Sequence, residues 1–312
     1  SNVASNGLFT LVFGLISGCP TILRLSQSSS KRLNLPLVIL NRLCELDKYN
    51  QIKKSFSIIH YSHDDEINKY FSSSVNIRVI WGGDKTIQKF KAFQTKPNCI
   101  DLVFPDRNSI AILSSEWLAN ANDKEIKKLA SGFAKDISLF DQMACSSPQS
   151  LLIIKDSKVE ISKKLKKFFE ICNLEISSQG FIDKDTFTLE NFKSKTNLCL
   201  SLYQAKMIYC ADYLFALKFD DFENIYQDIR PSHCCLLISE IIDLREIKSF
   251  LNNRNQTIVS IGLSEIQLTK LVSYVGPLDT NRIVSAGNAI NMNLFWDGYD
   301  IISFMSKIIQ FD

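Results

Sequence analysis

Short apolar runs alternate along the chain with longer segments in which apolar residues recur at every third or fourth position. Runs of the first kind are typical of buried strands, and the longer pattern is typical of helices that cover them. Strands are predicted at 21–25, 56–60, 77–81, 100–104, 109–113, 150–154, 214–218, 234–239, 256–261 and 282–285. Helices are predicted at 7–17, 31–46, 64–72, 84–93, 123–139, 158–171, 243–252, 264–274 and 298–309.

This alternation predicts βαβ units and a mainly parallel sheet with helices on both faces, so the expected fold class is α/β. At about 150 residues per domain, the chain length of 312 residues indicates roughly two domains. The change of domain is expected near 113–120 and divides the chain into 1–115, 116–285 and a C-terminal segment, 286–312. The polar run 26–30 is expected to connect the first strand to the next helix.

Composition narrows the class of protein. A net charge of +3 is too small to indicate binding to nucleic acid or to a charged membrane surface. No apolar run approaches the roughly 18 residues that cross a bilayer. The apolar start at 8–16 follows no basic region, so we do not interpret it as a signal peptide. The chain does not begin with Met, and we expect it to be a piece of a longer protein.

The cysteine content indicates the compartment. The chain has nine cysteines, an odd number, with no Cys-x-x-Cys pair and only three histidines. Neither a zinc site nor a disulfide framework is therefore expected, and no metal site is predicted. Free thiols favour a reducing compartment, so the protein is expected to be cytoplasmic.

One cysteine has unusual neighbours. Cys145 lies among small and polar residues, between a predicted helix and a predicted strand. A thiol in such a turn is a candidate nucleophile that carries an acyl group as a thioester. The alternative is an inert structural cysteine. Gln142 could orient a carbonyl group or hold the turn, and the residues 146–148 allow backbone amides to face a developing oxyanion.

Two further stretches could bind a phosphate. Gly82, Gly83 and Asp84 follow a strand and open a helix, where free backbone amides favour anions. Arg24 ends a strand just before Ser26, and a cation and a hydroxyl at that edge suit a nucleotide. The chain has no Gly-x-Gly-x-x-Gly, so a plain strand-to-helix turn and a surface loop stay open as alternatives.

Taken together, these stretches resemble the LuxC-type acyl-CoA reductases, a divergent branch of the aldehyde dehydrogenase superfamily. The resemblance implies a Rossmann-type nucleotide-binding domain at 1–115, whose N-terminal part is missing, and an α/β catalytic domain at 116–285. It also implies that the C-terminal segment, 286–312, returns to the nucleotide-binding and oligomerisation side of the protein. The matching stretches are 1–3, 18–26, 80–84, 140–149, 281–287 and 295–300.

The resemblance implies catalytic roles. Cys145 matches the cysteine that is acylated, and Asn2 matches an asparagine whose amide helps to form the oxyanion hole. Gln142, close before the cysteine, is the third expected catalytic residue.

It also implies a nicotinamide nucleotide. Arg24 stands where relatives have a lysine, and Gln27 stands where NAD-preferring relatives have a glutamate that grips the 2′-hydroxyl. An acid there would repel a 2′-phosphate, and its absence favours NADPH. The expected cofactor-binding residues are Arg24, Ser26, Gln27, Gly82, Gly83 and Asp84.

The chain departs from the superfamily at its general base, because the stretch 101–107 has no glutamate in place of Glu-Leu-Gly-Gly. That base activates water to hydrolyse a thioester, so its absence suits a reductive enzyme. The expected function is NADPH-dependent reduction of a long-chain acyl-CoA or acyl-protein thioester to the aldehyde. The alternatives are an oxidising aldehyde dehydrogenase and a non-catalytic nucleotide-binding or assembly subunit. Expected partners are an acyl-carrier or acyl-protein synthetase and a second copy of the chain.

Overall fold

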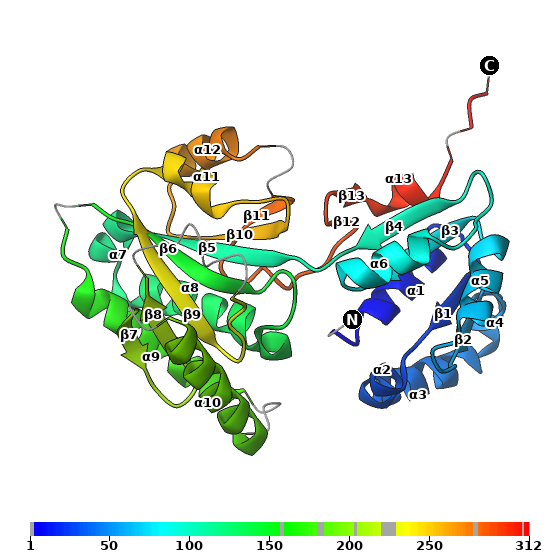
Figure 1. Cartoon of the computed structure of the whole chain (residues 1–312), viewed down its shortest axis with the longest axis horizontal. Coiled ribbons are helices and arrows are strands. Elements are labelled where there is room, and N and C mark those ends of the chain that lie inside the picture. The colour runs from blue at the N-terminus through cyan, green and yellow to red at the C-terminus, as the bar shows by residue number, and fades with distance from the viewer. Residues whose placement is uncertain are drawn as a thin grey trace. The chain divides into compact units, whose positions relative to one another are not determined.

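A computed structural model describes residues 3–156, 159–179, 184–202, 205–219, 229–276, 280–307 and 309–311. The chain forms two compact units, one built from Ser1–Asp106 with Met292–Asp312 and the other from Arg107–Asn291 (Figure 1). The first boundary therefore comes before the expected residue 115, because the strand that follows Arg107 belongs to the second unit. The second boundary comes after residue 285, and the last segment returns to the first unit.

The second unit is built on a seven-stranded sheet. Within the described residues, six of its strands run parallel and the edge strand β7 is antiparallel to its neighbour. The central strands are buried along their length, as expected for a parallel sheet covered on both faces. The order across the sheet is β11 (Arg282–Ser285), β10 (Asn255–Ile261), β5 (Asn108–Ser114), β6 (Pro148–Ile154), β9 (Cys235–Ile241), β8 (Phe215–Lys218) and β7 (Lys206–Cys210).

Two apolar cores cover the faces of this sheet. Side chains alternate between the faces, so Ala111 and Leu113 of β5 join one core while Ile110 and Ile112 join the other. The first core includes Phe133 on the helix at 123–138 and Phe168 and Phe169 on the helix at 162–178, all fully buried. The helices are α7 (Ser115–Asn120), α8 (Asp123–Ser138), α9 (Ser162–Ser178), α10 (Lys184–Ser201), α11 (Ile247–Phe250) and α12 (Glu265–Tyr274).

The first unit contains two separate pairs of parallel strands. β1 (Thr21–Arg24) pairs with β2 (Phe56–Ile59), and β3 (Ile77–Trp81) pairs with β4 (Ile100–Phe104). A cavity of about 790 Å³ is lined by residues of both β1 and β3. The other elements are α1 (Asn6–Ile16), α2 (Gln27–Arg32), α3 (Asn34–Cys44), α4 (Asn50–Lys54), α5 (Asp65–Ser74), α6 (Asp84–Lys91), the hairpin β12 (Phe295–Trp296) and β13 (Tyr299–Asp300), and α13 (Ile301–Met305).

The α/β fold class predicted from the sequence is confirmed, and most predicted strands are present within a residue or two. The polar run 26–30 was wrongly expected to be a connection. Ser26 caps α2, and its hydroxyl accepts a hydrogen bond from the Ser29 amide at 3.1 Å. A serine at this position satisfies a free amide of the first turn, so a polar run begins a helix here.

Two other predicted helices were longer than the observed ones or are divided, and two elements were missed. The helix expected at 298–309 shortens to α13, because β12 and β13 form a hairpin before it. The sequence pattern missed α10 and β7, since α10 has no clear apolar stripe and the strand is exposed at the sheet edge. The helix expected at 243–252 divides into a 3₁₀ turn, Leu244–Glu246, and α11.

A buried carboxylate joins α8 to the loop after β11. Asp136 is 1% exposed and accepts hydrogen bonds from the amides of Gly287 at 2.6 Å and Ala289 at 3.0 Å. The two segments approach closely, because a Cβ on Gly132 would lie 2.8 Å from the carbonyl oxygen of Ala286. Burial raises the pKa of Asp136 to about 7, although both amides favour its ionised form.

This shift predicts a pH-dependent stability. The folded carboxyl group binds its proton more tightly than the unfolded one, so its contribution is complete below about pH 4 and is lost as the pH rises to about 7. Within that window the free energy of unfolding should fall by up to about 1.4 kcal/mol per pH unit. Urea denaturation between pH 4.5 and 8 should show this slope in the native chain. The slope should be absent in Asp136→Asn, and an unchanged slope would contradict the assignment.

Candidate active site

Cys145 lies in a strained turn between α8 and β6. The 3₁₀ turn η2 (Leu139–Gln142) follows α8 directly, and the thiol comes three residues later, partly exposed. Phe140, Asp141 and Gln142 have φ angles of 56°, 54° and 63°, in the left-handed region that side chains disfavour. Each such residue costs about 1–3 kcal/mol, so other interactions must hold the turn in place.

Gln142 supplies the main brace. Its side chain is fully buried, and its Nε2 donates to the carbonyl oxygens of Pro148 at 2.8 Å and Cys235 at 3.0 Å. Its Oε1 accepts from the Cys235 amide at 3.1 Å. The His233 amide also donates to the Asp141 carbonyl oxygen at 2.9 Å. The sequence left two roles open for Gln142, and these contacts support the second role, which is to hold the turn.

Ser109 holds the cysteine from the other side. Its hydroxyl donates to the Cys145 carbonyl oxygen at 2.7 Å and accepts from the Thr257 amide at 3.1 Å. Ser109 is fully buried at the start of β5 and ties the turn to β10. Sequence reasoning missed it as part of the site. The only available signal was a hydroxyl at the head of an otherwise apolar strand.

Cys172, Cys234 and Cys235 of the second unit are buried, and their burial disfavours the thiolate that nucleophilic chemistry needs. Burial raises the pKa values of Cys172 and Cys234 well above the ordinary value for a thiol. Burial also raises the pKa of Cys235 to about 11. Cys199 and Cys210 are exposed, on α10 and on the edge strand. Cys145 thus combines partial exposure with a turn whose backbone is fixed.

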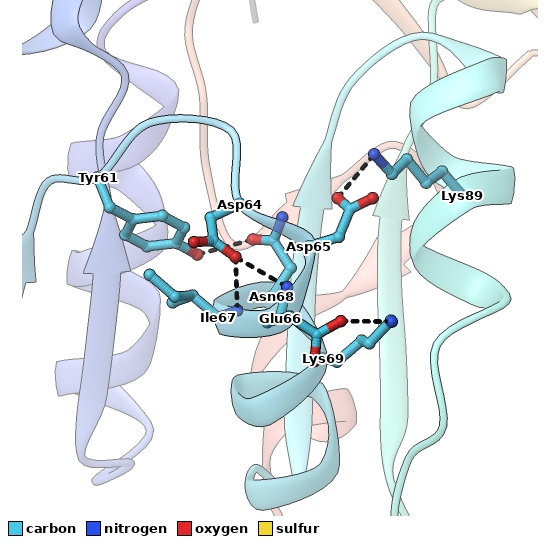
Figure 2. A network of polar contacts seen from close by, with 8 residues as sticks. All are labelled: Tyr61, Asp64, Asp65, Glu66, Ile67, Asn68, Lys69 and Lys89. Atoms are coloured by element: carbon cyan, nitrogen blue, oxygen red, sulfur yellow. Dashed lines mark hydrogen bonds and ion pairs between the residues drawn. The ribbon is translucent and has the colours of Figure 1, made fainter.

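The first unit gathers polar groups beyond the end of β1. Arg24 donates from Nη2 to the Tyr61 carbonyl oxygen at 3.3 Å, and its guanidinium lies 4.9 Å from the centre of the Tyr61 ring. Its Nε is buried and makes no hydrogen bond to the described residues. Figure 2 shows that Tyr61 points its hydroxyl at Asn68 Oδ1, 2.7 Å away, beside Asp64, which caps α5. An unpartnered guanidinium donor of this kind suits an anionic ligand.

The other predicted nucleotide residues begin α6. Gly83 is the N-cap of α6 and provides no side-chain cap, and a Cβ placed on it would meet nothing within 4 Å. The start of the helix therefore leaves room for a phosphate. Asp84 places an acid in the first turn, which disfavours a second anion there. Arg24 and Ser26 line the 790 Å³ cavity, whereas Gln27, Gly82, Gly83 and Asp84 are not among its lining residues.

Asn2 lies outside the described residues, so its predicted role in an oxyanion hole stays a prediction.

The part of the chain that the structure describes contains no group of three or more His, Cys, Asp or Glu side chains able to hold a metal ion. No helix within that part is long and apolar enough to cross a membrane.

Comparison with known sequences identifies the family. The profile of the family described as acyl-CoA reductase (LuxC) matches residues 1–171, which is more than half of the chain. The chain belongs to the LuxC family of acyl-CoA reductases.

Relatives within this family carry a more specific description. A long-chain acyl-protein thioester reductase of Aliivibrio fischeri is 26% identical over 319 residues, covering 99% of this chain and 61% of the relative. A long-chain acyl-protein thioester reductase 2 of Photobacterium leiognathi is 27% identical over 195 residues, covering 60% of this chain and 38% of the relative. The chain thus spans less than two thirds of the length of these LuxC relatives.

Solved structures show the fold of this LuxC-family chain. An NAD-dependent aldehyde dehydrogenase from Sinorhizobium meliloti aligns with a TM-score of 0.62 at 12% identity, covering 88% of this chain and 55% of that one. A bifunctional proline utilization A protein aligns with a TM-score of 0.62 at 11% identity, covering 91% of this chain and 29% of that one. The expected aldehyde-dehydrogenase-like fold is confirmed.

The brace at Gln142 generates a prediction. Gln142→Ala leaves two carbonyl groups and one amide without their partner, each at a cost of about 1–3 kcal/mol if it stays buried. We expect a lower melting temperature and faster alkylation of Cys145 by iodoacetamide, because the strained turn can then relax. The matched control is Met143→Ala, which changes an exposed side chain of the same turn. Equal effects of the two substitutions would refute the bracing role.

Proposed function

We propose that this chain forms part of an enzyme that reduces a long-chain fatty acyl thioester to the aldehyde through an acyl group on Cys145. The observation that supports this most strongly is a partly exposed thiol on a braced, strained turn in a chain of the LuxC family. The acyl donor is an acyl-CoA or an acyl-protein thioester, the second being the class named for the relatives. A protein that delivers acyl groups is the corresponding partner, and self-association stays a prediction.

The first step transfers the acyl group. The Cys145 sulfur attacks the donor carbonyl carbon, and the negative charge moves to the carbonyl oxygen. Collapse breaks the bond to the donor sulfur, which leaves as the thiolate and takes up a proton. Ser109 and Gln142 keep the backbone around Cys145 fixed during this change. A fixed backbone keeps the surrounding amides aimed at the oxyanion without reorganisation.

The second step releases the aldehyde. A nicotinamide nucleotide, held by residues such as Arg24 and Ser26, would supply the hydride, because no side chain can provide that chemistry. The role of this chain is to hold the acyl group on Cys145 while its carbonyl carbon is reduced. Collapse then breaks the carbon–sulfur bond and returns Cys145 as the thiolate, so the thiol is ready for another acyl group.

Reduction is favoured over oxidation by the stretch that stands in place of the superfamily's general base. Asp101 opens the stretch that replaces Glu-Leu-Gly-Gly, and Arg78 binds its two carboxylate oxygens at 2.7 and 2.6 Å. Both carboxylate oxygens of Asp101 are therefore occupied by the guanidinium of Arg78. This arrangement supports an enzyme in which the acyl group on Cys145 is protected from hydrolysis.

The cofactor in this proposal is NADPH, bound by the first unit. Arg24 has a buried donor atom without a partner, and Gln27 is neutral and exposed at the start of α2. Both side chains tolerate a 2′-phosphate, whereas an acid at either position would repel it. Ser26, Gly82 and Gly83 would contribute a hydroxyl and backbone amides to the remaining phosphates.

Acylation can be tested by intact-mass spectrometry of the full-length protein after incubation with a long-chain acyl-CoA. We expect a mass increase of one acyl group, which disappears when NADPH is added and aldehyde forms. Cys145→Ala should lose the adduct entirely because its nucleophile is gone. Cys199→Ala removes an exposed thiol of the same unit and should keep the adduct.

An acyl adduct that persists on Cys145→Ala would contradict the proposal. A wild-type protein that binds NADPH and never becomes acylated would instead select the non-catalytic nucleotide-binding subunit.

The nucleotide preference can be tested by fluorescence titration. Arg24→Ala should raise the Kd for NADPH about tenfold, equivalent to about 1.4 kcal/mol, because a charged hydrogen bond to phosphate is lost. Gln27→Glu should weaken NADPH binding and leave NADH binding nearly unchanged. Arg32→Ala, which removes a different cation at the end of α2, is the matched control. Equal losses for NADPH and NADH in both variants would show that neither residue contacts the 2′-phosphate.

A further inference from the structure

A second strained segment lies against the turn that carries Cys145. His233 and Cys234 have φ angles of 53° and 59°, in the left-handed region that side chains disfavour. They belong to residues 232–235, the β9 entry loop, which leads into the first residue of β9. Backbone of this kind persists only where its surroundings hold it, so the loop needs firm contacts with its neighbours.

The two strained segments hold each other. The cysteine turn, residues 139–145, accepts a hydrogen bond at the Asp141 carbonyl oxygen from the His233 amide, at 2.9 Å. It accepts a second at Gln142 Oε1 from the Cys235 amide, at 3.1 Å. Because both segments are strained, they could relax together unless a third element fixes one of them.

Asn191 of α10 fixes the β9 entry loop. Its side chain is 1% exposed, and its Nδ2 donates to the His233 carbonyl oxygen and lies 3.8 Å from Cys235 Sγ. The Phe187 ring, one turn earlier on α10, packs against the His233 ring with a distance of 6.0 Å between the ring centres. A buried amide is costly without a partner, and here the partner lies 42 residues away in the sequence. α10 is therefore joined to the loop by a polar bond as well as by packing.

Ser194 adds two longer bonds between α10 and the same loop. Its hydroxyl donates to the Ser232 carbonyl oxygen at 3.1 Å and accepts from the Ser232 amide at 3.4 Å. Asn191 and Ser194 are three residues apart, so they lie on one face of the helix. Polar side chains thus occupy helix positions that point at the loop, which is a reason why α10 has no clear apolar stripe.

We propose that Asn191 is a positioning residue for Cys145, which acts by holding the β9 entry loop, while the loop holds the cysteine turn. The bonds follow one another from Asn191 to His233, and from the loop to Asp141 and Gln142. The role in catalysis rests on the proposed function, in which Cys145 is the acylated residue. The coupling between the loop and the turn can be measured without acyl transfer.

A fixed turn matters for acyl transfer, since backbone amides beside Cys145 must face the developing oxyanion. Without the Asn191 amide, the His233 carbonyl oxygen loses this donor and the strained loop can relax. The Cys235 amide, at the end of the loop, would then shift away from Gln142. We expect a thiol that is more open to small reagents and less well placed for an acyl donor.

Alkylation kinetics test the coupling between α10 and the thiol. Iodoacetamide labelling of Cys145 is followed by peptide mass spectrometry, without nucleotide or acyl donor. Asn191→Ala should speed this reaction about tenfold, the change that loss of one hydrogen bond makes in a local opening equilibrium. Ser194→Ala should give a smaller increase, since its bonds to the loop are longer. Lys193→Ala changes an exposed side chain of the same helix and should have no effect.

A double-mutant cycle separates positioning from a general loss of stability. If Asn191 acts through the loop on Gln142, Asn191→Ala should have little effect on alkylation of Cys145 when Gln142→Ala is already present. Two independent structural effects would instead multiply. Cys172, fully buried on α9, should stay unlabelled in every variant, because only general loosening of the unit would expose it.

The same variants can be followed in acyl transfer from a long-chain acyl-CoA. Asn191→Ala should lower the maximal rate of acylation about tenfold and leave KM nearly unchanged, because the residue places the nucleophile and does not bind the donor. A wild-type protein whose Cys145 is alkylated but never acylated would refute the proposed function, and the alkylation rates would still decide the coupling.

Equal alkylation rates in Asn191→Ala and Lys193→Ala would overturn the proposal. Effects that multiply in the cycle would also overturn it, because Asn191 and Gln142 would then stabilise the protein separately. An increase of KM without a change in the maximal rate would assign Asn191 to donor binding and overturn its positioning role.

Discussion

The arrangement around Cys145 depends on one buried amide side chain. Three consecutive residues before the cysteine adopt the left-handed conformation, which β-carbons oppose. Gln142 compensates with three hydrogen bonds, all to backbone groups of β6 and β9 or their immediate ends. Since a glutamine amide both donates and accepts, one residue can satisfy carbonyl groups and an amide together. No hydrocarbon side chain of similar size could do the same.

Ser109 completes the support from the neighbouring strand. Its hydroxyl also donates and accepts, so the Cys145 carbonyl and the Thr257 amide are both satisfied through one oxygen atom. The cysteine is therefore fixed against β5, β6 and β9, three adjacent strands of a parallel sheet. A strained backbone conformation persists only where the surrounding structure holds it in place. In this chain the surrounding structure is the sheet itself.

The sequence predicted the buried strands well and missed the contacts that join residues far apart in the chain. Apolar periodicity identified β5, β6 and β9, because burial on both faces of a parallel sheet leaves a continuous apolar run. The small residues around Cys145 correctly indicated a tight turn. The partners of Gln142 could not be predicted, since Cys235 lies 93 residues away in sequence. The run that begins at Ser26 was wrongly predicted to be a connection. A local capping hydrogen bond outweighed the loop-like composition of this run.

The brace also determines how the turn responds to heat. A turn held only by its own residues can open locally while the rest of a protein stays folded. Here the supporting bonds end on the strands themselves, so releasing the turn means disturbing contacts at the centre of the sheet. Local opening of the turn around Cys145 is thereby coupled to global unfolding. The turn around Cys145 should lose its geometry in the same cooperative transition that melts the sheet.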